Sequence, residues 1–311
     1  MHINNTLGEV QKLFVGFPNY RRFKTLNDNI LVMTGPGPLA NQQVCLKKCV
    51  IKNPDLFNSF FERIINNKNP LVYQLLPSIS GGFIYHNNDY YIYAYKKVSG
   101  DVFTFTREKA INLGQSLSRL HNLLNVVDVK TNPTILENMI EQFLSRNLTS
   151  LSNGILRSQY VLDYLRNHPD IYQKPQSLVH GDMWAQNIIT NRHEITFIDF
   201  DCIRIFYNDY ELMRCFFISL IDYIIKETVP IQNYIFKFKG YFKSYRKNCD
   251  LDLLSAFEFY LFIFCLECEV EDMARHNARM HTFLRKRNVL QFILLKNLKV
   301  IFYEFNNLMV E

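Results

Sequence analysis

Three polar residues near the middle of the chain have the types and the spacing needed for phosphate transfer. Asn187 follows Asp182 by five residues, and Asp199 follows Asn187 by twelve. In phosphoryl-transfer enzymes one Asp accepts the proton of the acceptor hydroxyl, while an Asn and a second Asp bind the magnesium of the nucleotide. We therefore interpret Asp182 as the catalytic base, and Asn187 and Asp199 as metal ligands. The alternative, in which all three only cap a loop or close a strand, needs three coincidences at this spacing.

Short strands and one tight turn are expected to bring these side chains together. Leu178 and Val179 are typical of the end of a buried strand. The segments 187–190 and 195–198 are apolar and rich in β-branched residues, and the polar segment 191–194 separates them. This pattern predicts a hairpin between Asn187 and Asp199.

The residues around the hairpin resemble the aminoglycoside phosphotransferase and choline kinase-like superfamily of small-molecule kinases, which includes fructosamine kinase-like and spore-coat kinase-like members. The resemblance is carried by His180-Gly181-Asp182, Asn187, Ile198-Asp199-Phe200-Asp201, the segment Leu113 to His121, and Asp209-Tyr210-Glu211-Leu212. It covers about residues 25 to 220. Protein kinases usually carry Arg where this chain has Gly181.

The resemblance implies an α+β fold of the protein kinase-like, two-lobed type, with a β-rich N-lobe and a mostly helical C-lobe. We place a nucleotide-binding lobe at residues 1–95 and a catalytic and acceptor-binding lobe at residues 96–311. A length of 311 residues agrees with this division, because chains of this size usually split into lobes or domains.

The periodicity of apolar residues predicts the elements of the two lobes. Strands are expected over 24–34, 42–51 and 83–95, the last as a hairpin, and a helix is expected over 55–66. Beyond residue 206, apolar residues recur at helical spacing and predict a mostly helical second half.

A lysine that holds the nucleotide phosphates is expected on the third strand, where Lys47 and Lys48 compete. Strand alternation places Lys47 on the same face as Cys45, whose small side chain leaves room for an adenine, so we favour Lys47. Glu62 is the sole glutamate between Lys47 and Gly100. We therefore expect Glu62 to orient the lysine, although a solvated position on the helix surface is an open alternative.

These residues together predict a kinase that moves the γ-phosphate of ATP or GTP, with Mg2+, to a hydroxyl of a small molecule. An acidic run at Glu267, Glu269, Glu271 and Asp272 suggests a cationic acceptor, such as an aminoglycoside, an amino sugar or a choline-like amine. A solvated helix face explains the run equally well. Trp184 is placed either to stack on the acceptor or to pack internally.

A second class of function stays open, since the chain could be a weakly active or inactive kinase-like protein with a structural, spore-coat-type role. The combination of Asp182, Asn187, Asp199 and Lys47 argues against this alternative, because a scaffold has no need of metal ligands.

The composition excludes several other classes. The net charge of +6 is spread over the chain without a basic stripe, so we expect no nucleic acid partner. No apolar run is long enough to span a bilayer, and the seven cysteines form no disulfide pattern. We expect a cytoplasmic protein that binds no membrane, and the oligomeric state is left open.

Overall fold

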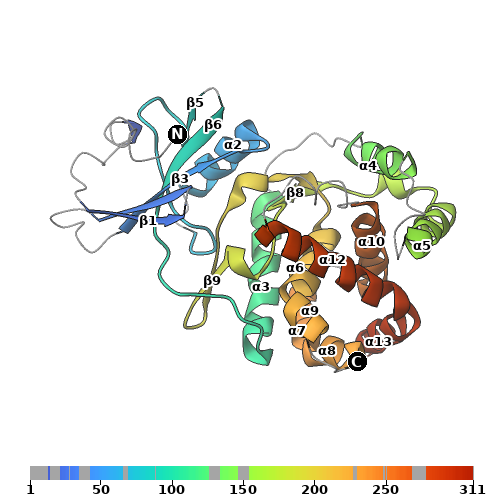
Figure 1. Ribbon diagram of the computed structural model, residues 1–311. Helices are drawn as coiled ribbons and strands as arrows, with labels where there is room; N and C mark the ends of the chain where they lie inside the picture. Colours follow the sequence, from blue (N-terminus) through green and yellow to red (C-terminus); the bar gives the residue numbers. More distant parts are fainter. Residues whose placement is uncertain are drawn as a thin grey trace. The chain divides into compact units, whose positions relative to one another are not determined.

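The chain forms two compact units. The computed structural model describes residues 13–14, 22–27, 29–34, 43–65, 69–87, 89–125, 134–145, 154–226, 230–247, 249, 251–267 and 278–310 (Figure 1). The first unit comprises Met1–Phe103, His180–Asp182 and Gln186–Arg204, and the second comprises Thr104–Val179, Met183–Ala185 and Ile205–Glu311. The assignment of nucleotide binding to residues 1–95, and of catalysis and acceptor binding to 96–311, stays a prediction.

An antiparallel sheet forms the centre of the first unit. Its strands follow the order β1-β2-β3-β6-β4, and β5 pairs with β6. The strands are β1 (Arg22–Asn27), β2 (Ile30–Thr34), β3 (Gln43–Cys49), β4 (Leu75–Leu76), β5 (Ile84–Asn87) and β6 (Tyr90–Lys96). Helix α2 (Pro54–Ile65) follows β3. The predicted strands and the predicted helix of this region are confirmed.

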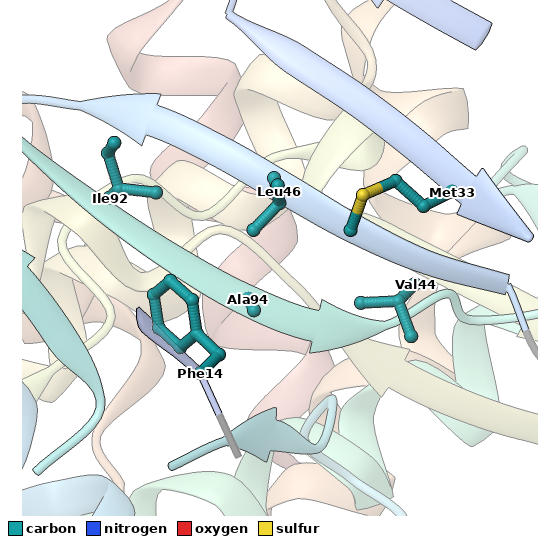
Figure 2. Packing of buried hydrophobic residues seen from close by; sticks show 6 residues of the cluster. All are labelled: Phe14, Met33, Val44, Leu46, Ile92 and Ala94. Atoms are coloured by element: carbon teal, nitrogen blue, oxygen red, sulfur yellow. The ribbon is translucent and has the colours of Figure 1, made fainter. Parts of the chain in front are cut away.

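Side-chain alternation gives this sheet two different faces. On one face, Val44 and Leu46 of β3 join a buried apolar cluster that also contains Phe14, Met33, Ile92 and Ala94 (Figure 2). On the other face Tyr93 of β6 packs against Phe57 of α2, with ring centroids 5.3 Å apart. Lys47 lies directly opposite Tyr93 in the β3–β6 register, so it belongs to this second, aromatic face.

A small three-stranded sheet completes the first unit. It has the order β10-β9-β7, with strands β7 (Asp101–Val102), β9 (Ile188–Asn191) and β10 (Glu194–Phe197). Arg192, in the turn between β9 and β10, has a φ of 54°. The predicted hairpin between Asn187 and Asp199 is therefore confirmed.

The second unit is mostly helical. Its helices are α3 (Arg107–Asn125), α4 (Thr134–Leu144), α5 (Gly154–Asn167), α6 (Asn208–Ser219), α7 (Ile221–Lys226), α8 (Ile231–Lys237), α9 (Lys239–Arg246), α10 (Leu253–Leu266), α12 (Ala278–Lys296) and α13 (Leu298–Val310) (Figure 1). The short strand β8 (Ser177–Val179) pairs with β11 (Arg204–Phe206). The predicted α+β fold, with a β-rich N-terminal part and a mostly helical remainder, is confirmed.

Within the described ranges, no helix combines the length and the apolar character required to cross a bilayer.

A buried polar triad ties three helices of the second unit together. The His121 Nε2 atom of α3 donates to Glu211 Oε2 of α6 at 3.1 Å, and the hydroxyl of Tyr245 in α9 donates to His121 Nδ1 at 2.6 Å. Nearby, a Cβ on Gly114 would lie 2.1 Å from the carbonyl oxygen of Tyr241. The glycine of the 113–121 segment therefore allows α3 and α9 to approach closely enough for the triad to form.

Buried ionisable groups in the second unit predict a loss of stability at alkaline pH. Burial raises the pKa of Cys215 and of Cys265 to about 12, and burial together with the charge of Glu267 raises that of Tyr210 to about 12. A raised pKa contributes stability that is present below the unfolded-state pKa and is lost as the pH rises toward the folded-state value. We expect the free energy of unfolding, measured with urea, to fall from about pH 9 upward. Cys215→Ala should reduce this decline, and a free energy that is constant from pH 8 to 11 would contradict the expectation.

Candidate active site

His180 fixes the loop that carries Asp182. Its imidazole is fully buried. The Nε2 atom donates to the carbonyl oxygen of Ile198 at 2.8 Å, and the Nδ1 atom accepts from the Asp182 backbone N–H at 3.3 Å. One imidazole thus ties the Asp182 loop to the residue immediately before Asp199.

Asn187 is oriented by Asp182. Its Nδ2 atom donates to the backbone oxygen of Asp182 at 2.8 Å and to Asp182 Oδ2 at 3.1 Å. In addition, the Asn187 carbonyl oxygen accepts from the Ile198 backbone N–H at 2.9 Å. The backbone of Ile198 therefore hydrogen-bonds both His180 and Asn187. Because Ile198 directly precedes Asp199, these bonds connect Asp199 to the loop that carries Asp182 and Asn187.

Asp199 has an unusual backbone conformation. Its φ of 69° and ψ of 61° are left-handed, a conformation that costs a residue with a Cβ about 1–2 kcal/mol. The next residue, Phe200, is fully buried and packs on His180 and on Phe60 of α2, with ring centroids 4.3 and 5.1 Å away. The left-handed residue thus stands between a buried aromatic ring and the ion pair of its own carboxylate with Lys47. Backbone strain of this kind is concentrated at functional sites.

Lys47 is the lysine that reaches the carboxylates. Its Nζ atom forms ion pairs with Asp199 and with Oδ2 of Asp201, the latter at 2.5 Å. In contrast, the Nζ atom of Lys48 lies 3.9 Å from the centre of the Tyr90 ring. Of the two candidates from the sequence, the structure brings Lys47 to Asp199.

Charge and burial act in opposite directions at this ion pair. Burial acts to lower the pKa of Lys47, but the charges of Asp201 and Asp199 outweigh it and raise this pKa above its ordinary value. Burial, and then the neighbouring charge of Asp199, raise the pKa of Asp201. Two carboxylates therefore share one ammonium group, and the local excess of negative charge favours a further cation.

Lys47 pairs with two aspartates. Both carboxylates that pair with Lys47 follow the hairpin, at Asp199 and Asp201, whereas Glu62 lies exposed on α2. The role of Glu62 as the partner of Lys47 stays a prediction. Tyr93, whose hydroxyl donates to Asp201 Oδ1 at 2.8 Å, was not singled out from the sequence. The alternation of β6 was the only sequence signal for Tyr93. Alternation alone does not place Tyr93 opposite Lys47, because the register between β3 and β6 cannot be deduced from the sequence.

The donor set fits a magnesium ion that is also held by phosphates. Both side-chain hydrogen bonds of Asn187 are donated by its nitrogen, which leaves the oxygen side of the amide to hold a metal. The Asp199 side chain is 35% exposed, against 13% for Asp201, so Asp199 is the more accessible carboxylate. Mg2+ usually takes one or two carboxylates plus substrate phosphates. Among the described residues, no group of three or more His, Cys, Asp or Glu is arranged to hold a metal ion.

The two acceptor clues from the sequence have internal contacts in the second unit. The Trp184 ring lies 5.3 Å from the ring of Phe283. Glu267 accepts a hydrogen bond from the Tyr210 hydroxyl at 2.6 Å and forms an ion pair with Arg287. The rest of the acidic run, residues 269–272, lies outside the described residues.

Gly181 is required by both its conformation and its surroundings. Its φ is +84°, and an added Cβ would lie 2.0 Å from the carbonyl oxygen of Cys202. We expect Gly181→Ala to displace the adjacent Asp182, and therefore to lower phosphate transfer by about 10- to 100-fold and the free energy of unfolding by about 1–3 kcal/mol. Gly81→Ala is the matched control, since Gly81 has a φ of +89° with nothing within 4 Å of the added Cβ. Equal effects of the two substitutions on urea unfolding and transfer would contradict the expectation.

Comparisons with known proteins find a matching family and similar folds. Residues 93–225 match the phosphotransferase enzyme family, and no curated protein matches the chain. An amicoumacin kinase, solved in complex with AMP-PNP and Ca2+, has a similar structure with a TM-score of 0.69 at 16% identity, covering 94% of this chain and 93% of that one.

Two further solved structures are similar over nearly their whole length. An aminoglycoside phosphotransferase from Alicyclobacillus acidocaldarius has a TM-score of 0.62 at 15% identity, covering 96% of this chain and 94% of that one. The choline kinase of Streptococcus pneumoniae has a TM-score of 0.61 at 10% identity, covering 95% and 100%. At these identities the structures establish the shared fold. The resemblance inferred from the residues is thereby confirmed at the level of the fold: this chain has the fold of the aminoglycoside phosphotransferases and choline kinases, and its residues 93–225 match the phosphotransferase enzyme family.

Proposed function

We propose that this chain is a small-molecule kinase that transfers the γ-phosphate of ATP or GTP to a hydroxyl group. The observation that carries the proposal is a continuous set of contacts within the first unit. Lys47 pairs with Asp199, the preceding residue Ile198 hydrogen-bonds Asn187, and Asn187 hydrogen-bonds Asp182. These contacts connect all four residues that have proposed roles in phosphate transfer: Lys47, Asp182, Asn187 and Asp199.

Each residue has a role that follows from its chemistry. Asp182 orients the acceptor hydroxyl and takes its proton as the new phosphate ester bond forms, while the bond from the γ-phosphorus to the β–γ bridging oxygen breaks and ADP or GDP leaves. Lys47 neutralises charge on the phosphates. Asn187 and Asp199 would hold Mg2+, which supplies positive charge to the phosphate oxygens when it is bound.

We place a small organic molecule with an amine group as the preferred acceptor. Solved structures with the same fold support a small-molecule acceptor, since they include an aminoglycoside phosphotransferase, a spectinomycin phosphotransferase and a choline kinase. Because Glu267 is already paired with Arg287, its charge is largely neutralised. A cationic acceptor therefore depends on the other acidic residues of the run.

The second candidate is a kinase-like protein without turnover. It would keep the fold but would have no need for a lysine and an aspartate paired at the position of the metal. Transfer of phosphate from ATP or GTP to an acceptor distinguishes the two candidates, because a protein without turnover can still bind a nucleotide.

The metal site is tested with Asp199→Ala. We expect Mg2+ to strengthen the binding of ATP to the wild-type protein by at least about tenfold, and to have little effect on the variant, because Asp199 is the accessible carboxylate of the site. Calorimetry with and without Mg2+ gives this comparison, and Asp89→Ala, an exposed position in the same unit, is the control. Absence of nucleotide binding by the wild type would overturn the kinase proposal. An unchanged Mg2+ effect in Asp199→Ala would overturn the metal assignment alone.

A further inference from the structure

We propose that Asp201, anchored by Tyr93, is the carboxylate that positions Lys47 for the nucleotide phosphates, in the place expected for Glu62. This role rests on the proposed kinase function, and it adds two positioning residues to the site. The evidence comes from strand register, hydrogen bonding and burial within the first unit.

The strand register brings Lys47 and Tyr93 to the same carboxylate. They are direct partners across the β3–β6 pair, so their side chains leave the same face of the sheet. Lys47 contacts Asp201 Oδ2 at 2.5 Å, and the Tyr93 hydroxyl donates to Asp201 Oδ1 at 2.8 Å. Because each carboxylate oxygen has its own donor, the rotation of the Asp201 carboxylate is fixed.

The main chain of Asp201 is held in the same region. Its carbonyl oxygen accepts from the backbone N–H of Lys52 at 3.1 Å, shortly after the end of β3. Asp201 is therefore tied through its backbone to the chain that leaves β3, and through its side chain to β3 and β6. A residue fixed at both ends is suited to hold a flexible lysine in one position.

The two aspartates that share Lys47 are suited to different tasks. The side chain of Asp199 is 35% exposed, whereas those of Asp201 and Lys47 are 13% and 12% exposed. Asp199 can therefore exchange the lysine for a metal while Asp201 keeps it. A lysine ammonium has three N–H donors, so a single bond to Asp201 leaves two for phosphate oxygens.

Exposure distinguishes Asp201 from Glu62. Glu62 is exposed on α2, and ion pairs in water contribute little to orientation, because solvent competes for both charges. Water weakens the ion pair of a buried carboxylate much less, and the hydrogen bond from a second donor also keeps that carboxylate in place.

Double-mutant cycles in the ligand-free protein, residues 1–311, test the assignment. We expect Lys47→Met and Asp201→Asn to be coupled by about tenfold or more in the equilibrium constant of urea unfolding, and Lys47→Met and Glu62→Gln by less than about twofold. Tyr93→Phe should also be coupled to Asp201→Asn. Tyr85→Phe is the control, because it removes the same hydroxyl from the same sheet, but Tyr85 of β5 packs against the apolar cluster of Val44 and Leu46, on the face opposite to Tyr93.

A kinetic cycle separates positioning from a purely structural role. Asp201→Asn should lower kcat/KM by about tenfold or more in the wild-type background and by less than about twofold in the Lys47→Met background. The same loss in both backgrounds, or a cycle in which Glu62 and not Asp201 is coupled to Lys47, would overturn the proposal. If Asp201→Asn does not fold, the same kinetic cycle is measured with Tyr93→Phe. This substitution removes the hydroxyl that donates to Asp201 but keeps the ring that packs on Phe57. If the wild type binds no nucleotide, the kinase function fails, while the unfolding cycles still decide which carboxylate holds Lys47.

Discussion

Replacing Asp182 with Asn is expected to slow phosphate transfer by about 10²- to 10⁴-fold, while nucleotide affinity changes by less than about threefold. The substitution keeps the shape of the side chain, so the neighbouring Asn187 is left in place. It removes the carboxylate that accepts the proton of the acceptor hydroxyl. The nucleotide is expected to be held by Lys47 and by the metal ligands Asn187 and Asp199, which the substitution leaves unchanged. Steady-state kinetics and calorimetric titration with ATP measure the two quantities separately.

The control for this prediction is Asp89→Asn, which removes one exposed carboxylate from the same unit, in the connection between β5 and β6. It should leave both kcat and ATP affinity at the wild-type values. Full activity in Asp182→Asn would remove Asp182 from the role of base. Loss of nucleotide binding in that variant would instead assign Asp182 to the nucleotide site.

The second large effect is expected on stability, from Glu211→Ala. Glu211 and His121 are 2% and 0% exposed, and they hydrogen-bond each other in the core of the second unit. Removing one member of a buried polar pair leaves the other without compensation and typically costs about 3–5 kcal/mol. We therefore expect a loss of this size in the free energy of unfolding, measured with urea.

A surface substitution and a double variant show whether the effect comes from the triad. Glu141→Ala, at an exposed position on α4, should change the free energy of unfolding by less than about 0.5 kcal/mol. The double variant Glu211→Ala/His121→Ala should be more stable than the sum of the single losses predicts, because the two side chains interact. Strict additivity would show that the two residues act independently.

Local patterns in the sequence predicted the elements that hold the site. The alternation of β3 correctly placed Lys47 and Leu46 on opposite faces of the sheet. The apolar segments 187–190 and 195–198, separated by the polar segment 191–194, correctly predicted the hairpin. These signals depend on neighbours one to four residues apart, and strand periodicity and turn composition act over that distance. The spacing of Asp182, Asn187 and Asp199 likewise depends on one loop and one hairpin.

The partners of Lys47 could not be deduced in the same way. Asp201 lies 154 residues from Lys47 along the chain, and its contact depends on the left-handed turn at Asp199 and on the β3–β6 register. Neither feature has a signal in composition. Glu62 is expected as a partner only because it is the sole glutamate between Lys47 and Gly100; it lies exposed on α2, whose buried face is aromatic, and its role stays a prediction.

The acceptor was the least predictable part for a similar reason. Trp184 packs near Phe283, and Glu267 pairs with Arg287, so both clues depend on contacts with α12, about 100 and 20 residues further along the chain. Sequence spacing carries no information about such contacts. A charged run that looks available to a ligand can therefore be partly neutralised within the fold.

The central claim is tested most directly by incubating the wild type and Asp182→Asn with ATP or GTP, Mg2+ and pooled acceptors, and detecting phosphate esters by mass spectrometry. The pools contain aminoglycosides, amino sugars, choline-like amines and small hydroxy amino acids. We predict a product whose mass exceeds that of one acceptor by a phosphate group, formed by the wild type and at most in traces by Asp182→Asn. Equal product from both proteins, or a wild type that neither forms product nor binds nucleotide, would contradict the account.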